Sequence, residues 1–163
     1  SYMDPILLAG CLKRPMRFVM WYRIFDIPVL NWFFRQTRAI PIASARENET
    51  VMNAAFEAIE EELAAGNVVC IFPEGGLTMD GEVQRFRPGI ERVLENQPVP
   101  VVPVALRRLW GSWFSRRRDG GLRRLPGRLF ARVPVSVGAP LPPTKASAAQ
   151  LELQVRALRG DER

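Results

Sequence analysis

The residues with the clearest chemical signature are Phe72-Pro-Glu-Gly75, which place a carboxylate after a proline at the end of an apolar run. The run, Val68–Phe72, is rich in apolar and β-branched residues and predicts a buried strand. Pro73 cannot donate to a neighbouring strand, so pairing should stop there, and the following glycines permit a tight turn. Ligands of α/β proteins bind at the carboxyl ends of strands. We therefore expect Glu74 at a ligand-binding turn, although a solvated acid on an ordinary turn is the simpler interpretation.

Two other segments carry groups that could take part in chemistry. Asp4 precedes Pro5 and an apolar stretch, and its simpler interpretation is a helix cap with proline at the first helical position. Arg85-Phe-Arg-Pro-Gly89 places positive charge beside the start of a helix, an arrangement suited to a phosphate. An ordinary basic loop explains that segment equally well.

Strands that alternate with helices should position these residues. Further strands are expected at Met16–Met20, Ala39–Ala43, Val99–Leu106 and Arg132–Val137. Helices are expected from Asn48 to Gly66, from Pro88 to Asn96 and from Ser147 to Leu158, and Trp21–Arg38 has helical spacing broken at Pro28. This alternation has the spacing of βαβ units and predicts an α/β fold.

Composition limits the classes of function. The 163 residues suffice for one domain, and a net charge of +6 with a pI near 10.3 favours an anionic partner. A chain with no histidine and two cysteines is a poor candidate for a zinc site. Cys11 and Cys70 lie in apolar runs, which favours buried free thiols and a reducing compartment. No apolar stretch approaches the roughly 18 residues of a membrane-spanning helix.

Together these segments resemble the phospholipid/glycerol acyltransferases, the family of glycerolipid and lysophospholipid acyltransferases. The family's first motif, Asn-His-x-Ser-x-x-Asp-Pro, is matched in its second half by Ser1–Pro5. Its third motif, Phe-Pro-Glu-Gly, is matched in full by Phe72–Gly75, and its fourth, an apolar strand with an internal proline, by Val101–Ala105. Arg85–Gly89 is similar to the family's basic Phe-Lys/Arg-x-Gly segment. The resemblance implies an α/β domain with a mixed, mostly parallel sheet flanked by helices, covering residues 1–163 and truncated within the first motif.

Two departures from the family pattern concern the acceptor. Members that act on lysophosphatidic acid often continue Thr-Arg-Ser after the third motif, whereas Gly76-Leu-Thr78 stands here. The second motif usually ends near an Asp-Arg pair, whereas Ala43-Ser44 stands here and Arg46 comes two residues later. Both missing arginines would serve a phosphate monoester. The chain is instead similar to acyltransferase domains fused to lysophospholipid transporters, which implies a lysophosphatidylethanolamine-like acceptor and a covalently fused transporter domain. The alternative acceptor is 1-acylglycerol-3-phosphate, with Arg46 or Arg87 replacing the missing arginines.

The resemblance implies general-base catalysis with no bound cofactor or metal. The base would be the family's histidine, two residues before Ser1, and Asp4 would orient it. It would take the proton of a glycerol hydroxyl, which attacks the thioester of acyl-CoA or acyl carrier protein. Without that histidine, the chain as given is expected to be inactive. The residues implied to bind the acceptor are Phe72, Pro73, Glu74, Gly75, Gly76, Thr78, Arg46 and Arg87.

The segment from Arg107 to Arg132 is dense in arginine and contains aromatic residues. Tryptophan suits a membrane interface, and each arginine near anionic lipid contributes roughly 1 kcal/mol, so we expect contact with an anionic membrane surface. A solvated basic loop is the alternative, and nucleic acid is disfavoured because no recognition motif accompanies the charge. The candidate contact residues are Trp110, Trp113, Phe114, Arg116, Arg117 and Arg118.

Location follows from the membrane interpretation. We expect the domain on the cytoplasmic face of the inner or plasma membrane, either peripheral or as part of a membrane protein. A hypothesis of a different class is a non-catalytic membrane-binding or regulatory domain.

Overall fold

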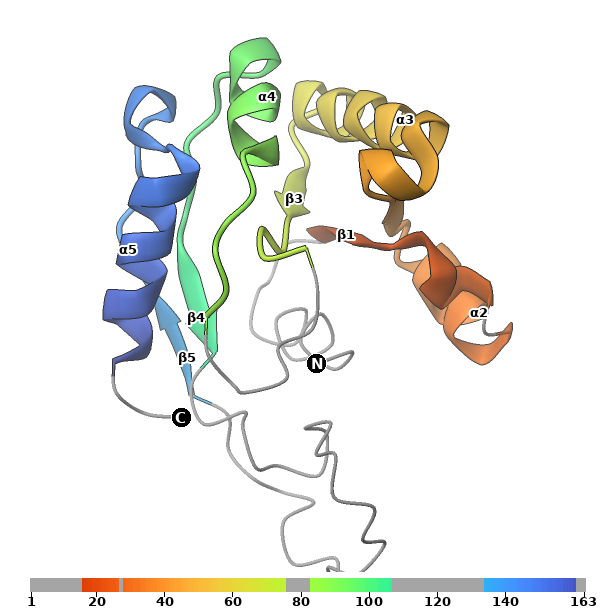
Figure 1. The fold of residues 1–163 in the computed structure, drawn as a ribbon, viewed down its shortest axis with the longest axis horizontal. Coiled ribbons are helices and arrows are strands. Elements are labelled where there is room, and N and C mark those ends of the chain that lie inside the picture. The colour runs from red at the N-terminus through yellow and green to blue at the C-terminus, as the bar shows by residue number, and fades with distance from the viewer. Residues whose placement is uncertain (1–15, 27, 76–82, 107–133, 161–163) are drawn as a thin grey trace, which may run out of the picture.

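The computed structural model describes residues 16–26, 28–75, 83–106 and 134–160 (Figure 1). The strands are β1 (Met16–Trp21), β2 (Ile40–Ile42), β3 (Val68–Cys70), β4 (Val104–Leu106) and β5 (Val135–Val137). The α-helices are α2 (Pro28–Gln36), α3 (Ala45–Ala64), α4 (Gly89–Asn96) and α5 (Ala148–Arg159). Two short 3-10 helices complete the described elements, η1 (Tyr22–Asp26) and η2 (Pro143–Lys145).

Strand β1 is the centre of a parallel sheet. Within the described ranges the strand order is β2-β1-β3, and β1 is parallel to both neighbours. Its first half, Met16–Phe18, pairs with β3, and its second half, Val19–Trp21, pairs with β2. Pro41 is accommodated because β2 lies at the edge of this sheet, as the sequence predicted.

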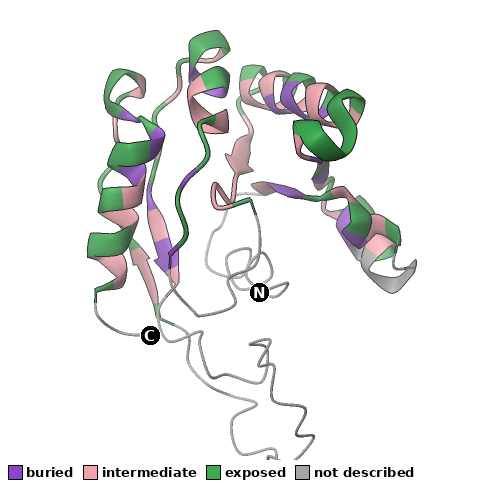
Figure 2. Cartoon of the chain, in the orientation of Figure 1, coloured by how far each residue is buried: buried purple, intermediate pink, exposed green. Residues whose placement is uncertain are grey.

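Strand β1 is buried on both of its faces. Successive side chains of a strand point to opposite faces, so neighbouring residues of β1 pack into different clusters. Val19 packs with Ile40 against the apolar face of α3, which includes Phe56 and Ile59. Phe18 and Met20 pack in a second cluster, against residues of η1 and α2. In Figure 1, α3 lies above β1, and buried positions occur on both elements (Figure 2). The sheet is therefore covered on both sides, as in other α/β proteins.

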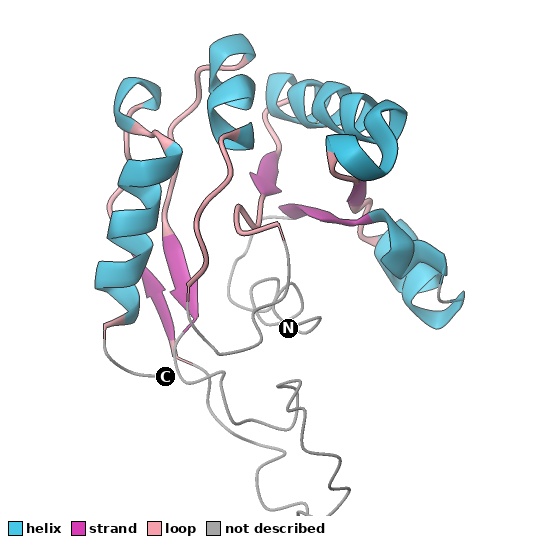
Figure 3. Cartoon of the chain, viewed as in Figure 1, coloured by secondary structure: helices cyan, strands magenta, loops and turns pink. Residues whose placement is uncertain are grey.

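The second part of the domain is built around β4 and β5, which pair antiparallel. A bridge between Val101 and Leu141 extends this pairing, and α5 runs alongside it (Figure 3). Gly138 is required at the crossing, because a Cβ there would lie 2.8 Å from the Pro103 ring. The predicted α/β fold with a mostly parallel sheet is confirmed, although the described antiparallel pair forms a ladder separate from the parallel one.

The helix boundaries follow the predicted signals, with one refinement at the start of α3. The helix begins at Ala45, and the Glu47 carboxylate accepts hydrogen bonds from the amide and hydroxyl of Ser44. Asn48 has extended backbone angles (φ −163°, ψ 99°) and its side-chain oxygen accepts from the Val51 amide. Asn48 therefore caps the long part of the helix, and an additional turn precedes it. At the other end, Gly66 has φ 78° and terminates the helix as predicted.

The prediction of a fully buried strand over Val68–Phe72 is wrong in extent. Ladder pairing ends at Cys70, and the residues of this run are half-buried rather than buried. The reason is that β3 has a ladder partner on one side only among the described strands. Ile71 and Phe72 leave the ladder before the proline rather than at it.

Several predicted site residues lie outside the described residues. They are Asp4, Gly76, Thr78, Trp110, Trp113, Phe114, Arg116, Arg117 and Arg118, together with Cys11. In the ranges that are described, no helix is both long and apolar enough to cross a bilayer.

Candidate active site at the end of β3

The Phe72–Gly75 motif forms a closed turn directly after β3. The Gly75 amide donates to the Phe72 carbonyl oxygen at 3.2 Å, which closes a four-residue turn. Proline at the second position and glycine at the fourth are favoured in such turns. Gly75 has φ 66°, a conformation that costs other residues free energy. The motif is therefore a turn with Glu74 near its tip, as the sequence predicted.

A second segment, Val83–Arg87, lies against this turn. The Glu74 carboxylate accepts a hydrogen bond from the Gln84 amide at 2.9 Å. The Arg87 amide donates to the Pro73 carbonyl oxygen, also at 2.9 Å. The Glu74 carboxylate therefore has a structural role, because its hydrogen bond joins the motif to the segment that carries Arg87.

The Arg87 side chain occupies the space beside Gly75. A Cβ placed on Gly75 would lie 2.5 Å from Nε and 2.8 Å from Cζ of Arg87, so a side chain there would displace the guanidinium. Glycine at this position therefore serves both the backbone conformation and the close approach of a cation. The structure brings together Phe72–Gly75 and Arg87, which the sequence had placed in one site.

Arg46 occupies a different part of the sheet edge. It is exposed in the first turn of α3, after β2. Because β1 lies between β2 and β3, two strand spacings, about 10 Å, separate the ends of those strands. Arg46 can serve the same ligand as Glu74 only if that ligand spans this distance, so its role stays a prediction.

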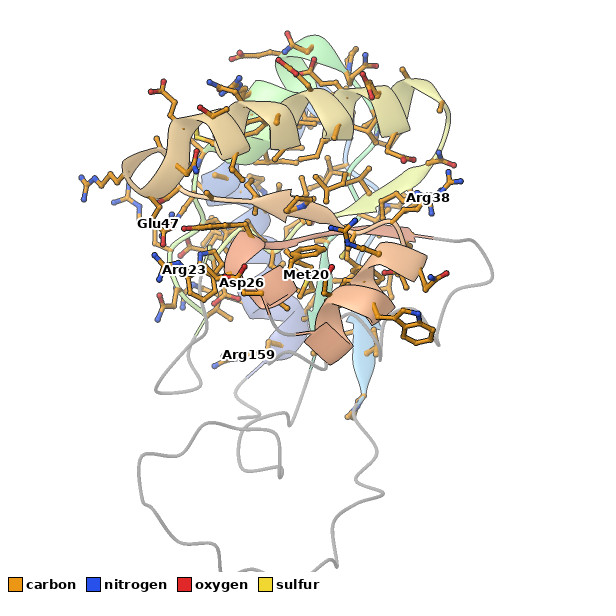
Figure 4. All side chains as sticks on the ribbon, turned by 90° about the vertical axis from the view of Figure 1, so that its right-hand side faces the viewer. Met20, Arg23, Asp26, Arg38, Glu47 and Arg159 are labelled. Atoms are coloured by element: carbon orange, nitrogen blue, oxygen red, sulfur yellow. The ribbon has the colours of Figure 1, made fainter. Side chains whose placement is uncertain are left out.

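The carboxyl end of β1 adds charged residues that the sequence did not single out. Arg23 lies over the Trp21 and Tyr22 rings, with its Cζ 5.6 and 5.7 Å from their centroids. Figure 4 places Arg23 close to Glu47, and Ser44 hydrogen bonds lower the pKa of that carboxyl below its usual value. Sequence spacing gave no signal that Arg23 lies near Glu47, because Glu47 follows a different strand, β2.

Cys70 is the nucleophilic side chain closest in sequence to the motif, and its environment argues against covalent catalysis. It is a free thiol packed with the second apolar cluster. Burial raises the pKa of Cys70 to about 12. The thiolate is the nucleophilic form, so this thiol is unreactive at neutral pH. The described residues contain no cluster of three or more side chains suited to a metal ion.

Comparison with known proteins places this α/β domain in a family. A family model described as Acyltransferase matches residues 1–107. A relative from Mycoplasma pneumoniae, named a probable 1-acyl-sn-glycerol-3-phosphate acyltransferase, is 26% identical over 72% of this chain and 45% of its own length. A 1-acyl-sn-glycerol-3-phosphate acyltransferase from Chlamydomonas reinhardtii is 30% identical over 82% of this chain and 38% of its own length.

A solved structure shares the fold. The crystal structure of the 1-acyl-sn-glycerophosphate acyltransferase PlsC from Thermotoga maritima matches with a TM-score of 0.68 and 24% identity, over 97% of this chain and 61% of that chain. The chain belongs to the Acyltransferase family, which confirms the resemblance inferred from its motifs. It spans less than half the length of the two relatives named above.

The raised pKa of Cys70 predicts slow alkylation. In a Cys11→Ser background, iodoacetamide at pH 8 should modify folded Cys70 at least about 100-fold more slowly than the same chain in urea, because little thiolate is present. Mass spectrometry of quenched samples gives both rates. Equal rates in the two conditions would mean that the thiol is accessible and ionises normally.

Proposed function

We propose that the protein transfers a fatty acyl group to the free hydroxyl of 1-acylglycerol-3-phosphate. The observation that carries this proposal is the Arg87 guanidinium beside Gly75, since it supplies a cation next to a motif that lacks its usual arginine. Guanidinium groups bind phosphate oxygens in bidentate fashion. The names of the relatives support the same acceptor.

The proposed reaction is a direct transfer between two substrates. The acceptor hydroxyl oxygen attacks the carbonyl carbon of an acyl thioester on CoA or acyl carrier protein. A new C–O ester bond forms, the C–S bond breaks, and the hydroxyl proton passes by way of the base to the leaving thiolate. We assign the base to the first motif, with Asp4 as its partner, and the acceptor phosphate to Arg87.

Lysophosphatidylethanolamine is the competing acceptor. It is favoured by Gly76-Leu-Thr78 in place of an arginine-containing sequence. Its phosphate is a diester with one negative charge, whereas the phosphate of 1-acylglycerol-3-phosphate carries nearly two. Fusion to a transporter domain also stays a proposal that belongs with this acceptor.

Replacing Arg87 should distinguish the two acceptors. We expect Arg87→Ala, in the protein extended through the first-motif histidine, to lower kcat/KM for 1-acylglycerol-3-phosphate about 10- to 100-fold, the value of a charge-assisted hydrogen bond. The loss should be smaller for lysophosphatidylethanolamine because the diester has less charge. Steady-state assays with both acceptors test this.

The matched control for Arg87 is Arg92→Ala, which removes an arginine of α4 whose guanidinium contacts Asn53 and the Phe56 ring. This variant should keep the wild-type acceptor preference. Equal losses for both acceptors in Arg87→Ala would contradict a role for Arg87 in selecting the phosphate monoester. A wild-type preference for lysophosphatidylethanolamine would overturn the acceptor itself.

Two glycines allow the effect of backbone strain to be separated from the effect on Arg87. Gly66 and Gly75 both have positive φ (78° and 66°), but a Cβ on Gly66 meets nothing within 4 Å. Either change to alanine should lower the free energy of unfolding by about 1 kcal/mol. Only Gly75→Ala should also lower acyl transfer strongly, because it displaces the guanidinium. Urea unfolding and acceptor kinetics measure the two effects, and equal activity in both variants would contradict this assignment.

We further propose that the domain works against an anionic membrane surface on the cytoplasmic side. Besides residues 110–118, the face formed by the end of β1, η1 and α2 has properties that support membrane contact. Trp32 is 68% exposed and Trp21 is 42% exposed, which is unusual for large aromatic side chains. Arg23 on η1, Arg35 on α2 and Arg38 just after α2 are exposed as well, and Figure 4 shows Arg23 and Arg38 at opposite ends of this face.

Replacing Trp32 tests this membrane contact. Trp32→Ala should weaken binding to vesicles that contain anionic lipid, because tryptophan prefers the membrane interface. Flotation with neutral vesicles and with vesicles of about 30% phosphatidylglycerol measures binding. Leu153→Ala removes a similarly exposed side chain (64%) from α5 and serves as the control. Equal flotation with both vesicle types would refute the electrostatic part.

A further inference from the structure

Helix α5 holds the Val83–Arg87 segment through two charged side chains. The Phe86 amide donates to Glu152 Oε2 at 2.9 Å, and Arg156 Nη2 donates to the Val83 carbonyl oxygen at 2.6 Å. Arg156 also donates from Nε and Nη2 to Glu152 Oε1, at 3.1 and 2.9 Å. One ion pair on α5 therefore satisfies an amide and a carbonyl of a segment 66 or more residues earlier in the chain.

The opposite edge of the same segment is bonded to the Phe72–Gly75 turn. The Gln84 amide reaches Glu74, the Arg87 amide reaches Pro73, and the Arg87 side chain lies against Gly75. The segment is neither helix nor strand, so these hydrogen bonds, one to a side chain and one to the backbone, satisfy amides that a helix or a sheet would otherwise satisfy. A shift of α5 relative to the turn would move Arg87.

We propose that Glu152 and Arg156 are positioning residues for the acceptor site, which act by holding the backbone that carries Arg87. This inference rests on the proposed function, because it gives Arg87 the task of binding the acceptor phosphate. If so, the geometry of the site is determined in part by α5, the last described helix, which lies far along the chain from every family motif.

Apolar packing allows this role to be tested without unfolding the domain. Val83 and Phe86 are buried at 8% and 7% exposure and pack with Ala148 and Leu151 of α5. These contacts remain when the polar pair is changed, so the helix should stay docked. What the pair adds is the position of the backbone along the helix, since hydrogen bonds are directional and apolar contacts are not.

The experiment compares the wild-type protein, extended through the first-motif histidine, with Glu152→Gln and with the charge-swapped variant Glu152→Arg/Arg156→Glu. The swap keeps an i,i+4 ion pair on α5 but removes the acceptor for the Phe86 amide and the donor to Val83. Glu152→Gln keeps a side-chain oxygen at position 152. Glu95→Gln, an exposed carboxylate on α4, is the control.

We expect kcat/KM for 1-acylglycerol-3-phosphate to fall about 10- to 100-fold in the swap, the effect of misplacing a positioning group, and by less in Glu152→Gln. The KM of the acyl donor should stay within about twofold, since the contacts concern the acceptor side. Hydrogen exchange at the Gln84, Phe86 and Arg87 amides should accelerate in the swap, while the amides of α3 should exchange as in the wild type.

The outcomes separate this inference from the proposed function. Unchanged exchange at residues 84–87 in the swap would overturn it, and so would faster exchange with unchanged acceptor kinetics. Equal losses for donor and acceptor would indicate general destabilisation and would also overturn it. No acyl transfer by the wild-type protein to either lysophospholipid would contradict the proposed function, whereas normal transfer by the swap would contradict only the positioning role.

Discussion

The site depends on the left-handed backbone of Gly75. This conformation lets the chain turn within five residues of the end of β3, and the missing side chain leaves room for Arg87. A side chain at this position would strain the backbone at positive φ and would displace the guanidinium. Glu74 and Pro73 then bind the Val83–Arg87 backbone through the Gln84 and Arg87 amides. The turn is therefore the point at which two segments become one site.

The rest of the domain positions this turn from two directions. The parallel sheet anchors its first residues, because β3 pairs with β1 and Phe72 packs with the cluster beneath the sheet. The same cluster includes Val104, Leu106 and Val135, so the antiparallel pair is joined to the parallel sheet by apolar packing. On the other side, α5 packs on Val83 and Phe86 and bonds their backbone. Apolar contacts bring the parts together, and hydrogen bonds determine their relative position.

The charge distribution agrees with a family whose named relatives act on a phosphate-bearing lipid. The net charge is +6, and exposed arginines occur at the ends of β1, of β2 and of the Val83–Arg87 segment. Three carboxylates in this part of the domain have structural partners. Glu47 is bonded to Ser44, Glu74 to Gln84 and Glu152 to Phe86, so each is used within the fold. These hydrogen bonds orient the carboxylates without removing their charge, so it is the net charge of +6 that favours an anionic ligand.

The sequence by itself determined the alternation of strands and helices, the family and the turn, but not the extent of β3. Local signals act over a few residues, so the cap at Asn48, the stop at Gly66 and the edge strand at Pro41 could be predicted, and the motif at Phe72–Gly75 identified the family. Only the tertiary structure decided which cation lies beside that motif. Arg46 and Arg87 were equivalent candidates in sequence, and strand order separates them, because β1 lies between the strands that precede each site. The contacts of Glu152 and Arg156 had no sequence signal either, since they depend on how α5 docks after a chain separation of more than 60 residues.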